Sequence, residues 1–286
     1  MPRPSRPPAA RPLKKKPGGR APRGPRRPPH RTDEQRERDN LQRIAGEAAV
    51  AAVFATAPQR VQRLFFEDRL KQVTGQWCLK LAQARRPYRM VPPDELARVA
   101  GTAMHGGVVA LVEPRPVQPF DARLAAQWAA EAQPVLLLDG VSNPHNFGAI
   151  VRTAVFFGIR RLIVSDHAGQ ALPSDASHRV AEGGFEYLDV YRAPNFAAAL
   201  RDLKRWFRVL GASAEGGKPM AALARDKRPD ALILGNEEQG LPKATIAACD
   251  ALVTIPGSGK VQSLNVAASA AILLHALATT SNKKGI

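Results

Sequence analysis

The sequence predicts an α/β protein in which a parallel sheet, covered by helices on both faces, follows a smaller α/β unit and a disordered basic tail. Apolar strands alternate with helices after residue 134, a shorter mixed pattern precedes them, and the N-terminus is rich in proline and positive charge. Apolar strands that alternate with helices are typical of parallel sheets buried on both sides. We expect a tail over 1–40, a small domain over 58–115, a linker over 116–133 and a main domain over 134–282.

The first 32 residues contain 11 Lys or Arg, no Asp or Glu, and 10 of the chain's 25 prolines. A segment of this composition has almost nothing to bury, so we expect it to be disordered. It supplies most of the net charge of +17, which arises from 42 basic and 25 acidic residues. Such an excess favours a polyanionic partner, because Lys and Arg displace the counterions of phosphates. The tail is interpreted either as an arm that tethers RNA or as a solubilising extension.

Weaker patterns lie between the tail and the main domain. We expect a helix over 41–54, which Pro58 ends, and then a helical stripe formed by Val61, Leu64, Phe65, Leu70 and Val73. A short strand around 88–91, a helix from Pro93 and a strand over 108–112 complete the small domain. The linker contains prolines and a short helix around Trp128.

The main domain alternates strands with helices. The candidate strands are Val135–Asp139, Leu162–Ser165, Tyr187–Tyr191, Val209–Ala212, Ala231–Gly235 and Leu252–Ile255. The candidate helices are Phe147–Phe157, Phe196–Phe207 and Leu264–Ala278.

Several classes of protein are disfavoured. Cys78 and Cys249 lie far apart, and no Cys or His cluster has the spacing of metal ligands, so we expect no metal site. No apolar run approaches the roughly 20 residues that a bilayer-spanning helix needs. We therefore expect a protein of the reducing cytoplasm.

Three segments carry candidate chemistry, and each begins where an apolar strand ends. Ligands of open α/β sheets bind at that edge. The first runs over 139–154, where Asn146 is the expected helix cap and Arg152 is the only charged residue of an apolar helix. A buried guanidinium needs an anion, which is either an internal carboxylate or an RNA phosphate. The second segment, 232–242, offers Glu237 as that partner.

The third segment, 253–270, leads through a glycine-rich loop into a helix that is apolar nearly all round and should be buried. Ser263 is the expected cap of that helix. Taken together, the three segments resemble the signature motifs of the SpoU/TrmH family of the SPOUT superfamily. The motifs read Asn143-Pro144-x-Asn146-x-Gly148-x-Ile150-x-Arg152, then Leu234-Gly235-Asn236-Glu237-x-x-Gly240-Leu241, and finally Ile255-Pro256 with Ser263-Leu264-Asn265-Val266-Ala267.

This resemblance implies an RNA ribose 2'-O-methyltransferase that uses S-adenosyl-L-methionine, works as a homodimer and has a deep trefoil knot. Residues 60–113 are similar to the family's L30e-like RNA-binding domain. The resemblance implies rRNA or tRNA as substrate. Carried over, the cofactor-binding residues are Gly235, Ile255 and Leu264, with Glu237, Ser263 and Asn265 close by. The implied catalytic residues are Arg152, Asn146, Glu237, Ser263 and Asn265.

Arginine is a poor general base because its pKa exceeds about 12. We therefore interpret Arg152 as a clamp on an RNA phosphate, with the hydroxyl proton leaving late or through water. The stretch 180–186 departs from the Lys-x-Ser-x-Gly-Ala-like pattern of the family, and no RNA contacts are carried over to it. Two alternatives are a catalytically idle RNA-binding protein on the same scaffold and a base-methylating relative.

Overall fold

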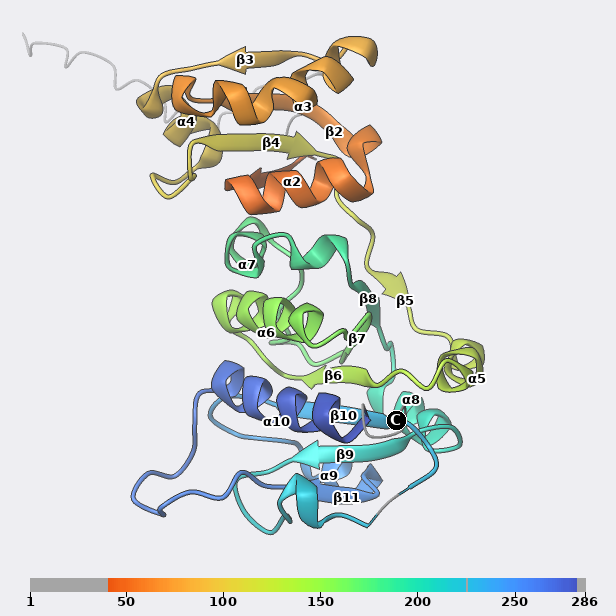
Figure 1. Cartoon of the computed structure of the whole chain (residues 1–286). Coiled ribbons are helices and arrows are strands. Elements are labelled where there is room, and N and C mark those ends of the chain that lie inside the picture. Colours follow the sequence, from red (N-terminus) through yellow and green to blue (C-terminus); the bar gives the residue numbers. More distant parts are fainter. Residues whose placement is uncertain (1–40, 225, 282–286) are drawn as a thin grey trace, which may run out of the picture. The chain divides into compact units, whose positions relative to one another are not determined.

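The larger of two sheets has seven strands, and every pairing between its neighbours is parallel (Figure 1). In spatial order the strands are β11 (Ala251–Val253), β9 (Arg208–Ala212), β10 (Asp230–Gly235), β6 (Val135–Asp139), β7 (Arg161–Val164), β8 (Asp189–Arg192) and β5 (Gln118–Pro119). The predicted α/β class with a parallel sheet is confirmed. The central strands β10 and β6 are buried along almost their whole length, as apolar strands between two helical layers must be.

The computed structural model describes residues 41–224 and 226–281. These residues belong to one unit, Asn40–Ile286. The tail that we expect to be disordered, over 1–40, lies outside the described residues.

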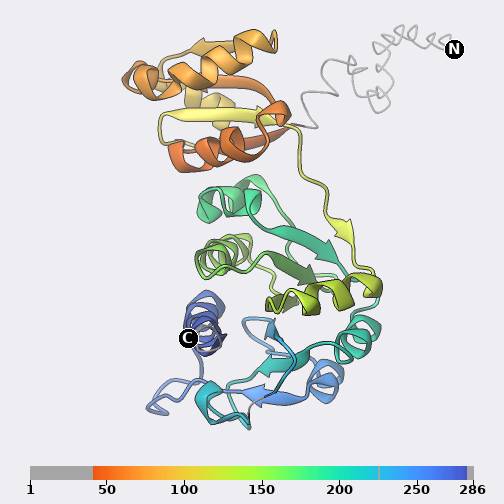
Figure 2. The same ribbon diagram turned by 45° about the vertical axis from the view of Figure 1, so that its right-hand side comes forward.

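Helices cover both faces of the larger sheet (Figure 2). One face packs against α6 (Pro144–Phe156), α7 (Asp175–Ala181) and α10 (Val266–Ser281). The other face packs against α5 (Ala122–Ala130), α8 (Phe196–Leu203) and α9 (Lys243–Ala248). The short 3-10 turns η3 (Gly184–Glu186) and η4 (Met220–Ala222) complete this region.

The chain returns from the edge of the sheet to its centre near the C-terminus. Strand β11 is an edge strand, whereas the helix that follows it, α10, packs against both α6 and the central strand β10. The inward face of α10 is buried as expected, at Val266, Ala270, Leu273 and Leu277. Its outward face leaves Ile272 exposed, and the neighbouring outward face of α6 leaves Phe156 exposed.

The smaller sheet has four strands in the order β1 (Gln42–Ala45), β4 (Val108–Val112), β2 (Val61–Phe66) and β3 (Tyr88–Met90). Strand β4 is antiparallel to β1 and β2, whereas β2 and β3 are parallel. The helices of this region are α2 (Glu47–Thr56), α3 (Lys71–Gln83) and α4 (Pro93–Ala100), with 3-10 turns η1 (Pro58–Arg60) and η2 (Asp68–Leu70). Because β1 belongs to the sheet, the sheet extends to the N-terminal side of residue 58.

Two predictions for this region are wrong. Residues 42–45 form a strand, and the helix expected over 41–54 begins only after Gly46, whose φ is +100°. The predicted helical stripe from Val61 is strand β2 as far as Phe66. Its apolar spacing also fits a strand that is buried against β4, and the cross-strand pairing decides the outcome.

None of the helices in the described ranges combines the length and hydrophobicity that a bilayer crossing requires.

Candidate active site

The first motif forms the turn between β6 and α6. Pro144 is at the start of α6, and the side chain of Asn143 caps the helix by accepting a hydrogen bond of 2.8 Å from the backbone N–H of His145. Our assignment of Asn146 as the cap is therefore wrong, since proline is favoured at the first helical position and the cap precedes it. Asn146 lies in the first turn, and its side chain contacts the other motifs instead.

Asn146 joins all three motifs through side-chain hydrogen bonds. Its Nδ2 donates to Oε1 of Glu237 at 3.0 Å, and its Oδ1 accepts from Nδ2 of Asn265 at 3.2 Å. The Glu237 carboxylate also accepts from the backbone N–H groups of Ser142 and Asn143, both at 3.4 Å. Three loops that are distant in the sequence therefore meet in one polar network.

The charge of Glu237 is stabilised by this network. Burial opposes ionisation of the carboxyl, but the hydrogen bonds from Asn146 and from the backbone of Ser142 and Asn143 outweigh it and hold the pKa of Glu237 below its ordinary value. The ionised carboxylate can only accept hydrogen bonds, which suits it to hold donors in place.

The second motif is a tight turn at the end of β10. Asn236 and Gly240 exchange backbone hydrogen bonds of 3.0 Å in both directions. A Cβ atom on Gly235 would lie 2.5 Å from the carbonyl carbon of Gly240, so only glycine fits there. The Asn236 side chain donates to the carbonyl oxygen of Gly140 at 2.8 Å, which ties this turn to the first motif.

The third motif ends in a cap. The Oδ1 of Asn265 accepts a hydrogen bond of 2.9 Å from the backbone N–H of Ala267, so Asn265 caps α10 and the expected cap, Ser263, does not. Ser263 and Leu264 lie on the exposed part of the loop, whereas Ile255 is half-buried against the core. Asn265 thus uses one side-chain atom to start the helix and another to bind Asn146.

Arg152 is separate from this network. Its Nη1 forms an ion pair of 2.8 Å with Oε1 of Glu182, and its side chain is 58% exposed. Our predictions of a buried guanidinium and of Glu237 as its partner are therefore wrong. Arg152 follows Asn146 by six residues on α6, which places it about 9 Å along the axis and about 120° around it. In one protomer, the two side chains leave the helix in different directions.

Residues 133–275 match the SpoU rRNA Methylase family, and residues 43–118 match the family described as RNA 2'-O ribose methyltransferase substrate binding. The chain belongs to the SpoU methylase family. Among its relatives, the uncharacterized tRNA/rRNA methyltransferase YfiF of Escherichia coli O157:H7 is 32% identical over 244 residues, covering 84% of this chain and 68% of the relative. The 23S rRNA (guanosine-2'-O-)-methyltransferase RlmB of Acinetobacter baylyi is 34% identical over 238 residues, covering 80% of this chain and 94% of the relative.

Solved structures have the same fold. The SpoU methyltransferase AviRb from Streptomyces viridochromogenes has a TM-score of 0.69 at 23% identity, and the alignment covers 88% of this chain and 94% of that one. An AdoMet-bound rRNA methyltransferase from Sinorhizobium meliloti has a TM-score of 0.70 at 22% identity, covering 87% and 91%.

The loops of this SpoU chain fit an adenosyl cofactor of the family. Gly235 lets the backbone of the second motif close tightly on Gly240, so the turn presents backbone groups at the end of β10. Leu264 of the third motif is 47% exposed, so its apolar side chain is available to contact a ligand. Ile255, in the same loop, is half-buried. Backbone polar groups beside apolar side chains are what a nucleoside-containing ligand requires.

Sequence reasoning missed two supporting contacts. The Oε1 of Gln170, a buried side chain after β7, accepts from the backbone N–H groups of Gly140 at 2.9 Å and Val141 at 3.2 Å. The buried carboxylate of Asp139 accepts a hydrogen bond of 2.6 Å from the Thr245 hydroxyl. Asp139 could have been found as an acid at a strand end, whereas a lone glutamine in a loop gives no signal.

His145 and His105 differ in exposure. His145 is exposed at the start of α6, beside the motif network. His105 is buried, lies 3.5 Å from Glu67, and accepts a hydrogen bond of 3.2 Å from the backbone N–H of Gly107 at its Nδ1. These contacts assign His105 to loop structure in the smaller sheet.

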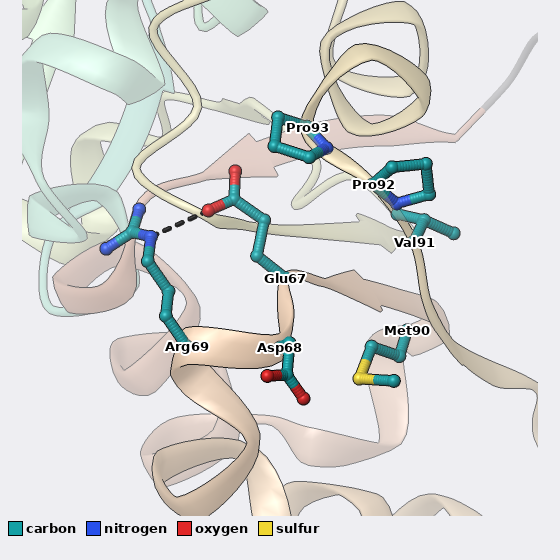
Figure 3. Close-up of a pocket in the computed structure, with 7 residues that line it drawn as sticks. All are labelled: Glu67, Asp68, Arg69, Met90, Val91, Pro92 and Pro93. Carbon is teal, nitrogen blue, oxygen red and sulfur yellow. Dashed lines mark hydrogen bonds and ion pairs between the residues drawn. The ribbon is translucent and has the colours of Figure 1, made fainter.

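A cavity of about 410 Å³ lies at the ends of the parallel strands β2 and β3, away from the motif loops (Figure 3). Its lining combines an ion pair of 2.6 Å between Glu67 and Arg69 with apolar surface from Met90, Pro92 and Pro93. Among the described residues, no group of three or more His, Cys, Asp or Glu side chains is arranged to hold a metal ion.

Proposed function

We propose that this chain transfers a methyl group from S-adenosylmethionine to a ribose 2'-hydroxyl of rRNA or tRNA, in the cytoplasm. The observation that carries the proposal is the network of Asn146, Glu237 and Asn265, which joins the three motif loops. The names of relatives support the reaction, since RlmB proteins are named 23S rRNA (guanosine-2'-O-)-methyltransferases.

The cofactor would be held by Gly235, Ile255 and Leu264, with Ser263 beside them. When bound, S-adenosylmethionine would supply an electrophilic methyl group on a sulfonium, from which a neutral thioether is a good leaving group. The protein must therefore bring the ribose oxygen into line with the methyl group and leave its proton a path to an acceptor. Holding two reactants in alignment can lower a barrier by about 7–11 kcal/mol.

Arg152 is proposed to clamp an RNA phosphate with its planar guanidinium. Asn146 and Asn265 orient the ribose hydroxyl and the loops around it. Glu237 fixes the amide of Asn146, and Ser263 offers a further hydrogen bond. The hydroxyl proton passes to water, because a guanidinium is protonated at every physiological pH.

The active unit is proposed to be a homodimer. Arg152 and Phe156 are four residues apart on α6 and share its outward face, and Phe156 is 82% exposed. Ile272 on the adjacent α10 is 45% exposed. An apolar face that is shared by two packed helices favours association with a second copy, which would bring the partner's Arg152 toward this chain's motif loops.

The C-terminal segment is proposed to form the trefoil knot of the family. The passage from edge strand β11 to α10, which packs on α6 and β10, supports a threaded path. Knots are rare exceptions among folds. The loops after β10 and β11 would then form the cofactor cradle together.

The smaller and the larger domain are proposed to have separate functions. An L30e-like domain over about 58–115, with β1 added to its sheet, binds RNA, and the domain over 134–282 carries out the methyl transfer. The match over residues 43–118 to the substrate-binding family supports this division. Exposed Arg89 and the cavity at the ends of β2 and β3 give that domain a polar and apolar surface for a nucleotide.

The deciding experiment is a ribose-methylation map of total RNA from a deletion strain, complemented by wild-type protein or by Arg152→Ala. We expect one or a few sites to be lost on deletion and restored by the wild type only, whereas Arg152→Ala should still bind S-adenosylmethionine in calorimetry. A pure RNA-binding protein would give no heat with the cofactor, and a base-methylating enzyme would leave the ribose map unchanged.

The shared site has a separate test. Arg152→Ala and Glu237→Ala are each expected to be inactive as homodimers. If Arg152 serves the partner's loops, mixed dimers of the two variants contain one complete site and regain activity. Activity that stays absent in mixed dimers would contradict the shared site.

A further inference from the structure

Glu182 is the only acid that pairs with Arg152 among the described residues, at 2.8 Å from its Nη1. The pair is only partly covered, with side chains 58% and 49% exposed. Glu182 lies in the stretch 180–186, where the sequence departs from the family pattern, and the proposed function gives it no role.

The backbone of Glu182 is in an unfavourable conformation. Its φ and ψ are 45° and 46°, which is the left-handed region, and it is one of three non-glycine residues with positive φ in the described ranges, beside Arg85 and Ala132. A residue with a Cβ costs about 1–2 kcal/mol there, and glycine or asparagine would avoid most of that cost. Glu182 also adds a negative charge at the C-terminal end of α7, where the helix dipole disfavours it.

Glu182 is nevertheless held firmly beside α6. A Cβ atom on Gly184 would lie 3.2 Å from the side chain of Val151 and 3.5 Å from the Cα of Arg152. A Cβ atom on Gly183 would lie 2.7 Å from the Cβ of Ala52. Because these two glycines pack closely on both sides, the Cα of Glu182 has a fixed position relative to the Arg152 backbone.

We propose that Glu182 is a positioning residue that holds the Arg152 guanidinium by one edge and leaves the other edge for an RNA phosphate. The inference rests on the proposed function of Arg152. The exposed pairing contributes at most about 1 kcal/mol, which is less than the two local costs at Glu182 together. Residues that break local rules in this way concentrate at functional sites. The carboxylate also repels phosphate, so it weakens RNA binding while it improves the alignment of Arg152.

These opposite effects predict a separation of kcat from RNA affinity. Glu182→Gln keeps the size and backbone conformation of the side chain but removes the charge, so we expect kcat to fall and the RNA dissociation constant to fall as well. An exposed ion pair corresponds to a change of about two- to fivefold in each quantity. The change in affinity should be larger at low salt, where charges are less screened.

Stability gives a readout that a merely structural role would not produce. Glu182→Asn places a residue that tolerates the left-handed region at this helix end, so we expect Tm to rise by about 2–4 °C while kcat falls. If Glu182 only supported the fold, both replacements would lower Tm. The matched control is Glu215→Gln, because Glu215 is exposed in a loop and has no ion pair in the described structure.

The experiment measures filter binding without cofactor and steady-state methylation on unmodified 16S and 23S rRNA transcripts and on bulk tRNA transcripts. The proposal is supported if Glu182→Gln lowers both kcat and the dissociation constant and Glu215→Gln changes neither. It is overturned if Glu182→Gln behaves like Glu215→Gln, or if RNA binding weakens. Wild-type protein that methylates none of these RNAs would contradict the proposed function, and the role of Glu182 with it.

Discussion

Replacing Phe156 by alanine tests whether the outward face of α6 is a subunit interface. Phe156 is 82% exposed, so almost all of its side chain is available to a partner and little of it stabilises the fold. Burial of a phenylalanine side chain contributes about 1.5–3 kcal/mol. A two-fold interface contains the residue twice, so the variant should lose about 3–6 kcal/mol of association free energy.

That loss corresponds to a dimer dissociation constant raised by about 100- to 20,000-fold. Sedimentation equilibrium over a wide range of protein concentrations measures the constant, and thermal unfolding checks that the variant is folded. Met104→Ala is a matched control, since Met104 is 83% exposed but lies in the smaller-sheet region. Wild-type protein that stays monomeric, or Phe156→Ala with an unchanged constant, would refute the assignment of this face.

Three further predictions concern stability and RNA binding. Thr245→Val should lower the free energy of unfolding by about 1.5–3 kcal/mol in urea titrations, because it leaves the buried Asp139 carboxylate without its donor, whereas Thr279→Val, at an exposed site, should have little effect. Glu237→Gln should lower the free energy of unfolding by about 1 kcal/mol at pH 7. Because folding lowers the pKa of Glu237, the difference in stability between wild type and variant is present above the ordinary pKa of 4.5. It should vanish as the pH falls through the pKa of the folded state. Deleting residues 1–32, with their 11 basic side chains, should reduce the steepness of the plot of log RNA affinity against log salt concentration, lowering the magnitude of its slope by up to about 8. An unchanged slope would exclude the tail from RNA contact.

The larger sheet could be predicted from the sequence because its strands are apolar throughout. Strand β6 has the predicted bounds, Val135–Asp139, and β10 and β9 differ from prediction by one residue at one end. The smaller sheet was harder. From Val61 onward, apolar residues recur every three or four positions, which fits a helix. Pairing with β4 nevertheless makes residues 61–66 a strand, and such long-range pairing leaves no signal in the local sequence.

The meeting of the three motifs could also be predicted, because the loops that follow the strands of a parallel sheet all lie at the same edge of that sheet. The individual contacts could not. Asn143 rather than Asn146 caps α6, and Asn265 rather than Ser263 caps α10. Asn146 is therefore released from capping and joins the motif loops instead. Which asparagine caps a helix depends on where the first turn begins, and sequence patterns locate helix ends poorly.

Arg152 pairs with Glu182 and not with Glu237 for a geometric reason, and the same geometry bears on the proposed dimer. Glu237 follows β10 and reaches the first turn of α6, whereas Arg152 lies six residues later, about 9 Å along the helix and about 120° around it. In this structure Arg152 pairs with Glu182 and not with the Asn146 network. Arg152 instead shares its face with Phe156, so the surface proposed to meet a second copy also carries the guanidinium. If that face closes on a partner, the phosphate clamp and the cofactor loops come from different copies, and Glu182 holds the clamp in place before the RNA arrives.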